Sequence, residues 1–415
     1  MVSSDPLEVL HSSAPALLEA AEQFGTPCYV TALAEVDRRA ADLRRAFPDP
    51  WIRQYSLKAN PLPALVERLA KDGLGANVVS AGEWAAAAKA GLPNRLISFE
   101  GIGKTDAELR AAVAAAAVGE PLRWVTVESG SEMRVLEEAA RGARLSESEH
   151  VLDVLLRLNP AVAPETRAEF QVGSKTSKFG MPEPELRELV EASVGRPSGL
   201  RVRGIHIHVG SQLMGTEAWA GGAVKACQLL AEMSRLSGDL DTVDVGGGFP
   251  STESPSPTSF RESLDQHLDE AGVALPRWVA IEPGRYLVAS AGWLLTRVLH
   301  VRERPSLPQV VIDASMSELI RPALYGAIHP LFALTTAAGR PVATEVEGAV
   351  CESTDTFGIH DLPPLRRGDL LVLATTGAYA SSMFSSYNGR PRPPEVLLQP
   401  DNTLTLARQR TPFAP

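Results

Sequence analysis

A regular alternation of apolar strands and amphipathic helices between Trp51 and Ile281 is the strongest constraint on the fold. Short apolar runs bounded by turn residues predict eight strands, at Trp51–Leu57, Gly75–Val79, Leu96–Glu100, Trp124–Glu128, Val151–Leu158, Val202–Val209, Leu240–Val245 and Trp278–Ile281. Helical patterns separate them, among them Ala81–Ala90, Asp106–Ala117, Ser131–Arg141, Glu183–Val194, Ala218–Leu236 and Ser259–Ala271. Eight such units predict a closed, parallel (β/α)8 barrel of the TIM type. The alternative, an open doubly wound sheet, would favour a glycine fingerprint after the first strand, and the sequence has none.

Beyond Arg285 the helical periodicity fades, and β-rich runs separated by Pro, Gly and Asp turns predict an all-β domain. Its expected strands are Leu294–Val301, Gln309–Ile312, Ala343–Val350, Asp369–Ala374, Glu395–Leu398 and Thr403–Leu406. The early strand Cys28–Thr31 precedes the barrel and is expected to join this domain. We therefore predict an N-terminal segment over residues 1–34 that joins the β domain, a barrel over 35–285, and a β-rich domain over 286–415.

Composition excludes several classes of function. The net charge of −10, with no block of Lys or Arg, argues against a nucleic-acid surface. No apolar run approaches the roughly 20 residues of a membrane helix, and Met1–Pro15 lacks the pattern of a signal peptide. Three scattered cysteines without paired spacing predict no disulfide and no structural metal site, and indicate a reducing, cytoplasmic setting.

Lys58 stands at the end of the first barrel strand, just before Asn60-Pro61 stops it. Barrel enzymes carry their chemistry at the carboxyl ends of the strands. A lysine that is partly desolvated there can form an imine with an aldehyde cofactor. A solvated strand-end lysine is the alternative that the residue alone leaves open.

Three further strand ends carry unusual residues. His206 and His208 alternate with apolar residues and therefore point to one face, although a histidine there is also common in a satisfied core. The triplet Gly246-Gly247-Gly248 frees backbone N–H groups that can surround a phosphate, or forms a tight turn. Glu282 and Arg285 flank a Pro-Gly turn, where they could hold a heterocyclic nitrogen and an anion, or form a surface ion pair.

Taken together, these runs resemble the pyridoxal-phosphate-dependent decarboxylases of the alanine-racemase fold type, and within them the diaminopimelate decarboxylase branch. The resemblance covers nearly the whole chain in family order. The residues that carry it are Tyr55-Ser56-Leu57-Lys58-Ala59-Asn60, Ser177-Lys178-Phe179-Gly180, His206-Ile207-His208-Val209-Gly210-Ser211-Gln212, Gly246-Gly247-Gly248, Glu282-Pro283-Gly284-Arg285, Arg321-Pro322-Ala323-Leu324-Tyr325, Cys351-Glu352-Ser353 and Gly377-Ala378-Tyr379.

The resemblance implies a role for each matching position. Lys58 would carry the imine to pyridoxal 5'-phosphate, and Cys351 would be the catalytic proton donor. The cofactor would be bound by Lys58, His208, Ser211, Gly246, Gly247, Gly248, Glu282, Gly284, Arg285 and Tyr379. Glu282 would keep the ring nitrogen protonated, so that the ring accepts the electrons that loss of carbon dioxide leaves at Cα. Cys351 and Glu352 would enter the active site of a second copy, which implies a homodimer with shared sites.

The same resemblance implies a small amino-acid substrate, most closely meso-diaminopimelate, which decarboxylation converts to L-lysine. The implied substrate residues are Arg285, Arg321, Tyr325, Glu352 and Tyr379. Two arginines suit a distal carboxylate and Glu352 suits a distal ammonium. Substrates without that carboxylate would leave the arginines unsatisfied in a desolvated pocket.

The sequence departs from the family pattern at Asn77, where Asp is usual, at Glu100–Lys104, at Phe249-Pro250, and at Arg167 and Val172. We expect several of these positions to line the mouth of the barrel, where they would affect the choice of substrate. A second hypothesis is therefore a decarboxylase of a larger or conjugated diamino acid in siderophore or antibiotic metabolism. A third is a catalytically silent relative that binds a partner, against which the retention of Lys58 and Cys351 argues.

Overall fold

The computed structural model describes residues 6–162, 164–166, 177–334 and 339–412. The chain divides into two compact units. One consists of Ala40–Gly284, and the other combines Met1–Arg39 with Arg285–Pro415. Helix α2 (Leu33–Ala46) carries the chain from the second unit into the first. The N-terminal strand therefore belongs with the C-terminal residues, as its position before the barrel predicts.

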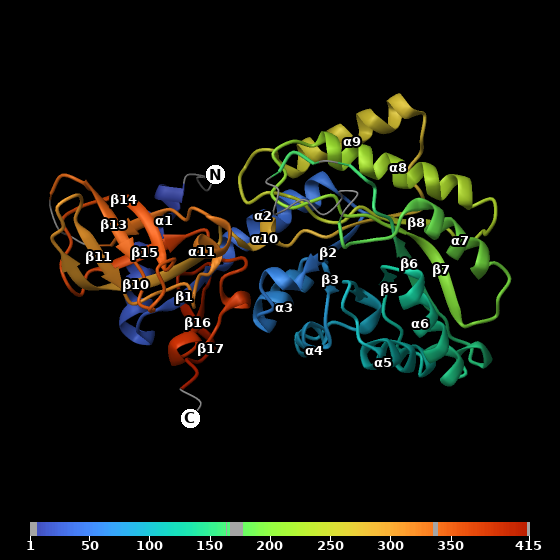
Figure 1. Cartoon of the computed structure of the whole chain (residues 1–415), viewed down its shortest axis with the longest axis horizontal. Helices are drawn as coiled ribbons and strands as arrows, with labels where there is room; N and C mark the ends of the chain where they lie inside the picture. Colours follow the sequence, from blue (N-terminus) through green and yellow to red (C-terminus); the bar gives the residue numbers. More distant parts are fainter. Residues whose placement is uncertain (1–5, 163, 167–176, 335–338, 413–415) are drawn as a thin grey trace. The chain divides into compact units, whose positions relative to one another are not determined.

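The Ala40–Gly284 unit is a closed barrel of parallel strands in the order β2-β3-β4-β5-β6-β7-β8-β9 (Figure 1). This confirms the predicted fold. The strands are β2 (Ile52–Ser56), β3 (Gly75–Val78), β4 (Ile97–Phe99), β5 (Trp124–Val127), β6 (Leu152–Arg157), β7 (Leu200–His206), β8 (Thr242–Asp244) and β9 (Trp278–Ile281). The helices between them are α3 (Pro63–Lys71), α4 (Ala81–Lys89), α5 (Asp106–Ala117), α6 (Gly130–Gly142), α7 (Glu183–Ser193), α8 (Glu217–Met233) and α9 (Pro257–Ala271).

Polar caps start several of these helices close after the preceding strand. Ser80 and Ser129 each accept a hydrogen bond from the backbone three residues on, at the starts of α4 and α6. Thr105 and Glu108 form a reciprocal capping box at the start of α5. Such caps satisfy backbone donors that have no partner within the helix. They fix where each strand gives way to a helix, and so where the strand-end side chains lie.

The second unit is built around a nine-stranded mixed sheet with the order β14-β13-β11-β10-β1-β16-β17, with β15 pairing with β10 and β12. Its strands are β1 (Cys28–Ala32), β10 (Gly292–Arg302), β11 (Gln309–Ile312), β12 (Leu331–Ala333), β13 (Val342–Glu347), β14 (Thr356–Leu362), β15 (Leu370–Ala374), β16 (Glu395–Leu398) and β17 (Leu404–Arg408). The strands β12 and β14 are additions to those that the sequence predicts. Both are short or half-exposed, so their apolar pattern is weak.

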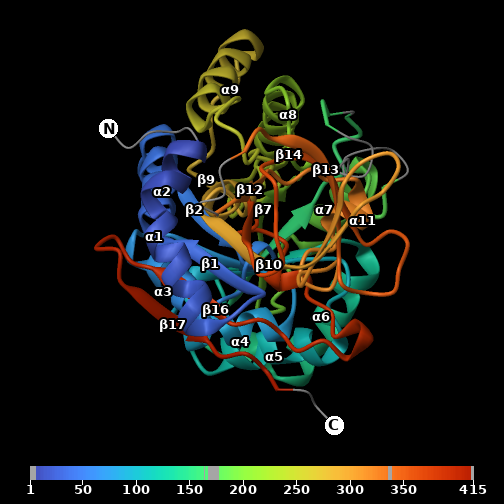
Figure 2. The ribbon, with the colours of Figure 1, turned by 90° about the vertical axis from the view of Figure 1, so that its left-hand side faces the viewer.

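Helices also contribute to this unit, which is therefore not all-β. They are α1 (Pro6–Phe24), the short α10 (Arg285–Val288) and α11 (Arg321–Tyr325). Leu17 and Ala20 of α1 belong to the same buried core as Val30, Trp293 and Val396. The helix α1 lies beside β1 (Figure 2). The apolar face of the amphipathic helix α1 is thus buried against the sheet of the β-rich unit.

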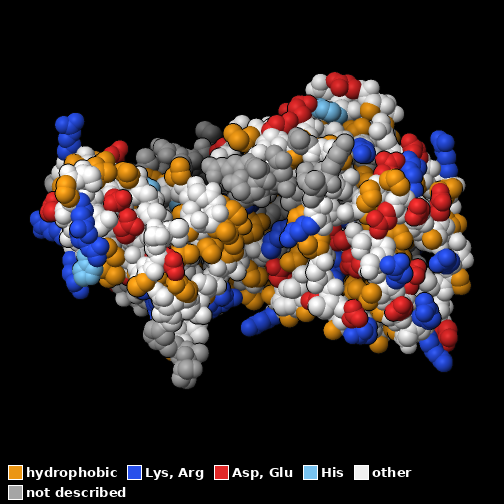
Figure 3. All heavy atoms as spheres, viewed as in Figure 1, with side chains coloured by type: hydrophobic (Ala, Val, Ile, Leu, Met, Phe, Trp, Pro, Cys, Tyr) orange, Lys and Arg blue, Asp and Glu red, His pale blue; other side chains and the backbone are white. Residues whose placement is uncertain are grey.

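Surface chemistry agrees with the overall composition. Acidic and basic side chains are interspersed over the barrel helices in the space-filling view (Figure 3). Within the described part of the chain, no helix is both long and apolar enough to cross a membrane.

Candidate active site

Lys58 lies on a single 3-10 turn, Leu57–Ala59, directly after β2. Two hydrogen bonds hold this turn: the Tyr55 hydroxyl donates to the Asn60 carbonyl at 2.9 Å, and the backbone of Leu62 donates to the Asn60 side chain at 3.2 Å. Leu57 and Ala59 are buried on either side, whereas the Lys58 side chain is exposed.

Glu282 follows β9 and is 6% exposed. The Asn77 side-chain amide donates to its Oε1 atom at 2.7 Å. Asn77, on β3, is itself oriented by Ser56, whose hydroxyl donates to the Oδ1 atom of the Asn77 side chain at 3.1 Å. The parallel register places Ser56 beside Asn77, so the barrel strands set this geometry directly. An amide at residue 77 thus holds Glu282 in place.

Glu100 and His206 complete a buried cluster with Glu282. The His206 Nε2 atom lies 3.3 Å from a Glu100 oxygen and 3.5 Å from a Glu282 oxygen. The Thr126 hydroxyl donates to the other Glu100 oxygen at 3.3 Å. One ligand-type atom from each of Glu100, His206 and Glu282 lies within 4.8 Å of the others. That spacing allows hydrogen bonds to be shared among all three.

Burial strongly affects the acid–base behaviour of this cluster. Burial raises the pKa of the Glu282 carboxyl well above its ordinary value, and the negative charge of Glu100 raises it further. Burial alone would raise the pKa of Glu100, but His206 and hydrogen bonds from Glu282 and Asn77 outweigh it and lower that pKa to about 2. Burial lowers the pKa of His206, so its imidazole is neutral near pH 7. Two carboxylates therefore share one proton.

His208 lies just beyond β7, and the backbone N–H of Gly247 donates to its Nδ1 atom at 3.2 Å. Burial, with the nearby charge of Lys58, lowers the pKa of His208 well below its ordinary value. The Lys58 charge also acts on Glu282, where it partly offsets the increase in pKa that burial causes. Lys58, His208 and Glu282 each follow a strand of the parallel barrel, so all three lie at the carboxyl ends of the strands.

The glycine triplet after β8 is required by close packing. Gly246 has φ +70°, and a Cβ there would lie 2.8 Å from the His208 ring nitrogen. A Cβ on Gly247 would lie 2.6 Å from the Glu282 carbonyl oxygen. The loop thereby passes directly beside His208 and Glu282, which leaves the backbone rather than side chains facing this end of the barrel.

Ser211 and Gly284 also lie at the carboxyl ends of the strands. The Thr166 hydroxyl donates to the Ser211 carbonyl at 2.6 Å, and the Gln212 side chain accepts from the Ser251 backbone at 2.9 Å. Gly284 packs against Ser56, since a Cβ there would lie 3.0 Å from the Ser56 Cβ atom. Ser211 and Gly284 thus follow barrel strands at the same end as Lys58, His208 and Glu282.

Arg285, Arg321, Tyr325 and Tyr379 lie in the β-rich unit, together with His329. The Arg285 guanidinium lies 4.5 Å from the centre of the Tyr379 ring. Burial lowers the pKa of Arg285, and Tyr379 and Tyr325 partly offset it. Arg321 donates to His329 Nε2 at 3.0 Å, and both side chains are buried. Four of the five predicted substrate residues therefore belong to one cationic and aromatic group.

Cys351 and Glu352 occupy an exposed loop of the same unit. Asp355 anchors its base by accepting from the backbone of Met316 and Val350. The Tyr387 hydroxyl donates to Glu352 at 2.5 Å, and the Cys351 backbone donates to Asn388 at 3.1 Å. These contacts hold the loop that carries the exposed thiol and the exposed acid.

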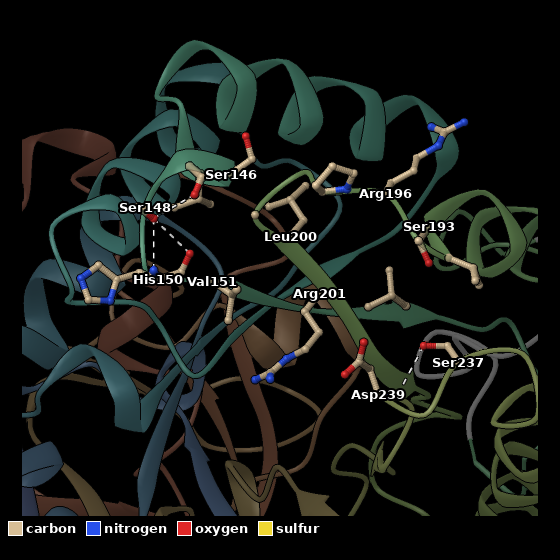
Figure 4. A pocket seen from close by; sticks show the side chains of 16 residues that line it. Ser146, Ser148, His150, Val151, Ser193, Arg196, Leu200, Arg201, Ser237 and Asp239 are labelled. Carbon is tan, nitrogen blue, oxygen red and sulfur yellow. Dashed lines mark hydrogen bonds between the residues drawn. The ribbon is translucent and has the colours of Figure 1, made fainter.

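A surface hollow of about 380 Å³ lies elsewhere, near Val151 and Leu200 (Figure 4). Those residues stand at the amino-terminal ends of β6 and β7, opposite the strand ends that carry Lys58 and Glu282. This hollow is therefore separate from the candidate active site.

The sequence patterns assign no contact with Glu282 to Asn77, Glu100 or His206, although all three lie beside it in the structure. Asn77 and Glu100, two of the departures from the family pattern, are 1% and 4% exposed. Phe249 is buried against Phe260, with ring centres 4.9 Å apart. The available signal was the position of Glu100, an acid at the last residue of the predicted strand Leu96–Glu100. The departures at Arg167 and Val172 lie outside the described residues.

Residues 33–289 match the family model described as "Pyridoxal-dependent decarboxylase, pyridoxal binding domain". The chain belongs to this family. The diaminopimelate decarboxylase of Deinococcus radiodurans is 36% identical over 400 residues, which cover 96% of each chain. That of Aquifex aeolicus is 33% identical over 400 residues, covering 95% of this chain and 91% of the relative. The crystal structure of the Helicobacter pylori enzyme complexed with L-lysine has a TM-score of 0.85 at 30% identity, covering 95% of this chain and 96% of that one.

The residues at the carboxyl end of the barrel fit the pyridoxal group that the family implies. An exposed amine on Lys58 is accessible to an aldehyde, and a neutral His208 ring lies at the same end. Glu282 offers a buried carboxyl for a heterocyclic nitrogen. The donor set therefore suits an aromatic aldehyde with a ring nitrogen better than a metal ion, which would favour open carboxylates without a shared proton.

Proposed function

We propose that this protein is a pyridoxal 5'-phosphate-dependent decarboxylase that converts meso-diaminopimelate to L-lysine and carbon dioxide. The observation that carries the proposal is the placement of Lys58 and the buried Glu282 at one end of the barrel. Pyridoxal phosphate, when bound, withdraws the electrons that remain at Cα after carbon dioxide leaves. The names of the relatives support the choice of substrate.

The barrel residues bind and orient the cofactor. Lys58 attaches it through its amine, His208 supports the ring face, and Glu282 holds a proton at the ring nitrogen. The backbone around Gly246–Gly248 and Ser211 receives the phosphate, since both loops leave main-chain groups at this end. Gly284 allows the Glu282 loop to approach Ser56 closely.

The residues of the β-rich unit select the substrate. Arg285 and Arg321 present buried cationic groups for carboxylates, and Tyr325 and Tyr379 supply hydroxyls beside them. Tyr379 also contacts the Arg285 guanidinium and fixes its plane. Glu352 provides the anion for the distal ammonium. This division of charge matches a substrate with a carboxylate beside its distal amine.

We infer that two copies assemble so that Cys351 and Glu352 of one copy complete the active site of the other. Cys351 is exposed on its own chain and would return the proton to Cα there. Large apolar side chains of the same unit are also exposed, including Leu324 at 51% and Ile328 at 84%. Such side chains suit a protein interface. The three free cysteines fit a cytoplasmic enzyme.

The alternative substrate, a larger conjugated diamino acid, rested on departures at the barrel mouth. The side chains of Asn77, Glu100 and Phe249 are buried, so none of them offers an exposed group that would bind a larger substrate. A screen that measures carbon dioxide release from meso-diaminopimelate, lysine, ornithine and arginine tests the proposal. We expect diaminopimelate to react far faster than the other three. Release from a conjugated diamino acid alone would contradict the substrate, and no release from any amino acid would support the silent-relative hypothesis.

A further inference from the structure

Glu100 and Glu282 are two buried carboxyls at the strand ends of β4 and β9. The His206 Nε2 atom lies 3.3 Å from a Glu100 oxygen and 3.5 Å from a Glu282 oxygen, and one oxygen of each acid lies within 4.8 Å of the other. A proton on one of the two carboxyls relieves the repulsion between them at this spacing. Arg157 is nearby, but its guanidinium pairs with Glu128 at 2.5 Å. Two adjacent negative charges at 6% exposure or less would repel each other strongly.

The tautomer of His206 follows from its contacts. Its buried Nδ1 atom has no hydrogen-bond partner among the described residues. Its Nε2 atom faces both Glu100 and Glu282, so the single N–H of a neutral imidazole belongs on Nε2. His206 can therefore donate one hydrogen bond to the two carboxyls while carrying no charge. The proton that separates the two negative charges must then be carried by one of the carboxyls.

Other groups that act on this pair come from the surrounding strand ends. Charged or titratable side chains that influence Glu100, His206 or Glu282 are Lys58, Glu128, Arg157, His208 and Asp244. Asp244 is itself buried and accepts hydrogen bonds from the Gly246 backbone and the Gln54 side chain. Burial raises the pKa of Asp244 well above its ordinary value.

We propose that Glu100 is a positioning residue, which keeps one proton on Glu282 before the cofactor binds. This inference rests on the proposed function and deepens it. When a pyridine nitrogen arrives, the O–H bond of Glu282 breaks and an N–H bond forms. Glu282 becomes a carboxylate, the ring becomes a pyridinium, and the net charge of the site is unchanged. The cofactor nitrogen is thus protonated from within the protein, without a proton from solvent.

Infrared spectroscopy of the full-length protein freed of cofactor tests the pair directly. A protonated carboxylic acid gives a distinct carbonyl band. If one such band of the wild-type protein is lost in the Glu282→Gln variant, that band belongs to Glu282. We expect this band in the wild-type protein at pH 7, and we expect Glu100→Gln to lower its titration midpoint by at least about one pH unit. The matched control is Asp153→Asn, a buried acid paired with Arg201 and Arg203, which should leave the midpoint unchanged. An equal midpoint in wild type and Glu100→Gln would overturn the proposal.

The single variant Asn77→Asp provides a test that does not depend on the folding of Glu100→Gln. The Asn77 amide contacts Glu282, so a carboxylate there would face the same oxygen. Asn77→Asp alone should raise the Glu282 midpoint further, and Asn77→Asp with Glu100→Gln should return it towards wild type. If Asn77→Asp leaves the Glu282 midpoint where it is, neighbouring charge does not control the proton and the inference fails.

Binding of pyridoxine 5'-phosphate, which lacks the aldehyde, gives a second readout. Calorimetry in buffers of different ionisation enthalpy counts the protons taken up with each bound molecule. At a pH where the free ring nitrogen is unprotonated, Glu100→Gln should take up close to one more proton than wild type. Equal proton uptake contradicts the inference. Failure of the compound to bind the wild-type protein contradicts the proposed function instead, and the infrared result then decides the carboxyl pair alone.

Discussion

The buried guanidinium of Arg321 donates a hydrogen bond to the buried Nε2 atom of His329 at 3.0 Å. The other ring nitrogen of His329 lies 3.1 Å from the Ala374 carbonyl, which can only accept a hydrogen bond. The proton of the neutral imidazole is therefore on Nδ1, and Nε2 is left to accept from Arg321. Ala374 ends β15, so the sheet fixes the position of the guanidinium through the histidine.

Protonation of His329 should destabilise the protein in acid. Burial and the charges of Arg321 and Arg285 lower the pKa of His329 to about 4. In the unfolded chain His329 binds this proton near pH 6.5. The contribution of the neutral His329 to the free energy of unfolding is therefore complete above that pH, and it is lost as the pH falls towards 4. We expect a loss of about 3 kcal/mol across this window. Chemical denaturation of wild type and His329→Gln at several pH values measures it, and parallel pH dependences of the two proteins would contradict the assignment.

Arg321→Ala should weaken the use of diaminopimelate selectively. We expect kcat/KM for meso-diaminopimelate to fall. The loss should correspond to about 2–4 kcal/mol of transition-state stabilisation, the range for leaving a buried charge unpaired. The slow turnover of lysine should barely change, because lysine has no distal carboxylate. The control is Arg366→Ala, at an exposed arginine of the same unit. Equal losses with both substrates would assign Arg321 a structural role.

Lys58→Ala should abolish covalent attachment of the cofactor. The amine at residue 58 is exposed on its turn and can reach an aldehyde. Borohydride reduction followed by peptide mass analysis should find the cofactor on Lys58 in wild type and on no peptide in the variant. Lys71→Ala changes another exposed lysine of the barrel and should keep the modification. Modification of any other lysine in wild type would remove Lys58 from this role.

Cys351→Ala should retain the cofactor and slow turnover by about 10²–10⁴-fold, as expected for loss of a general acid. If the thiol completes the site of a second copy, mixing Lys58→Ala with Cys351→Ala protein should restore about a quarter of wild-type activity. The reason is that random pairing produces one intact site in half of the dimers. Full activity of a wild-type monomer, checked by light scattering, would argue against shared sites.

Thiol labelling should distinguish Cys351 from the other two cysteines. Burial raises the pKa of Cys28 and of Cys227 to about 12, whereas Cys351 is exposed. A limited dose of iodoacetamide should therefore modify Cys351 first, because the thiolate is the reactive form. Peptide mapping should show that Cys351→Ala resists this early labelling. Early modification of Cys28 or Cys227 would contradict the burial of those thiols.

The sequence by itself determined the barrel, because each strand and helix leaves a local periodic signal. It placed all eight barrel strands close to their observed bounds, and it located Lys58 and Glu282 at strand ends. Strands β12 and β14 escaped prediction because they are short or half-exposed, and their pairing partners supply most of their stability.

Only the tertiary structure decided which side chains act together. Asn77, Glu100 and Glu282 come from β3, β4 and β9, and no local pattern indicates that their carboxyl and amide groups meet. Closure of the barrel brings those strand ends together, and burial then forces the two acids to share a proton. The pairing of Arg321 with His329 likewise depends on the end of β15, since the Ala374 carbonyl selects the histidine tautomer.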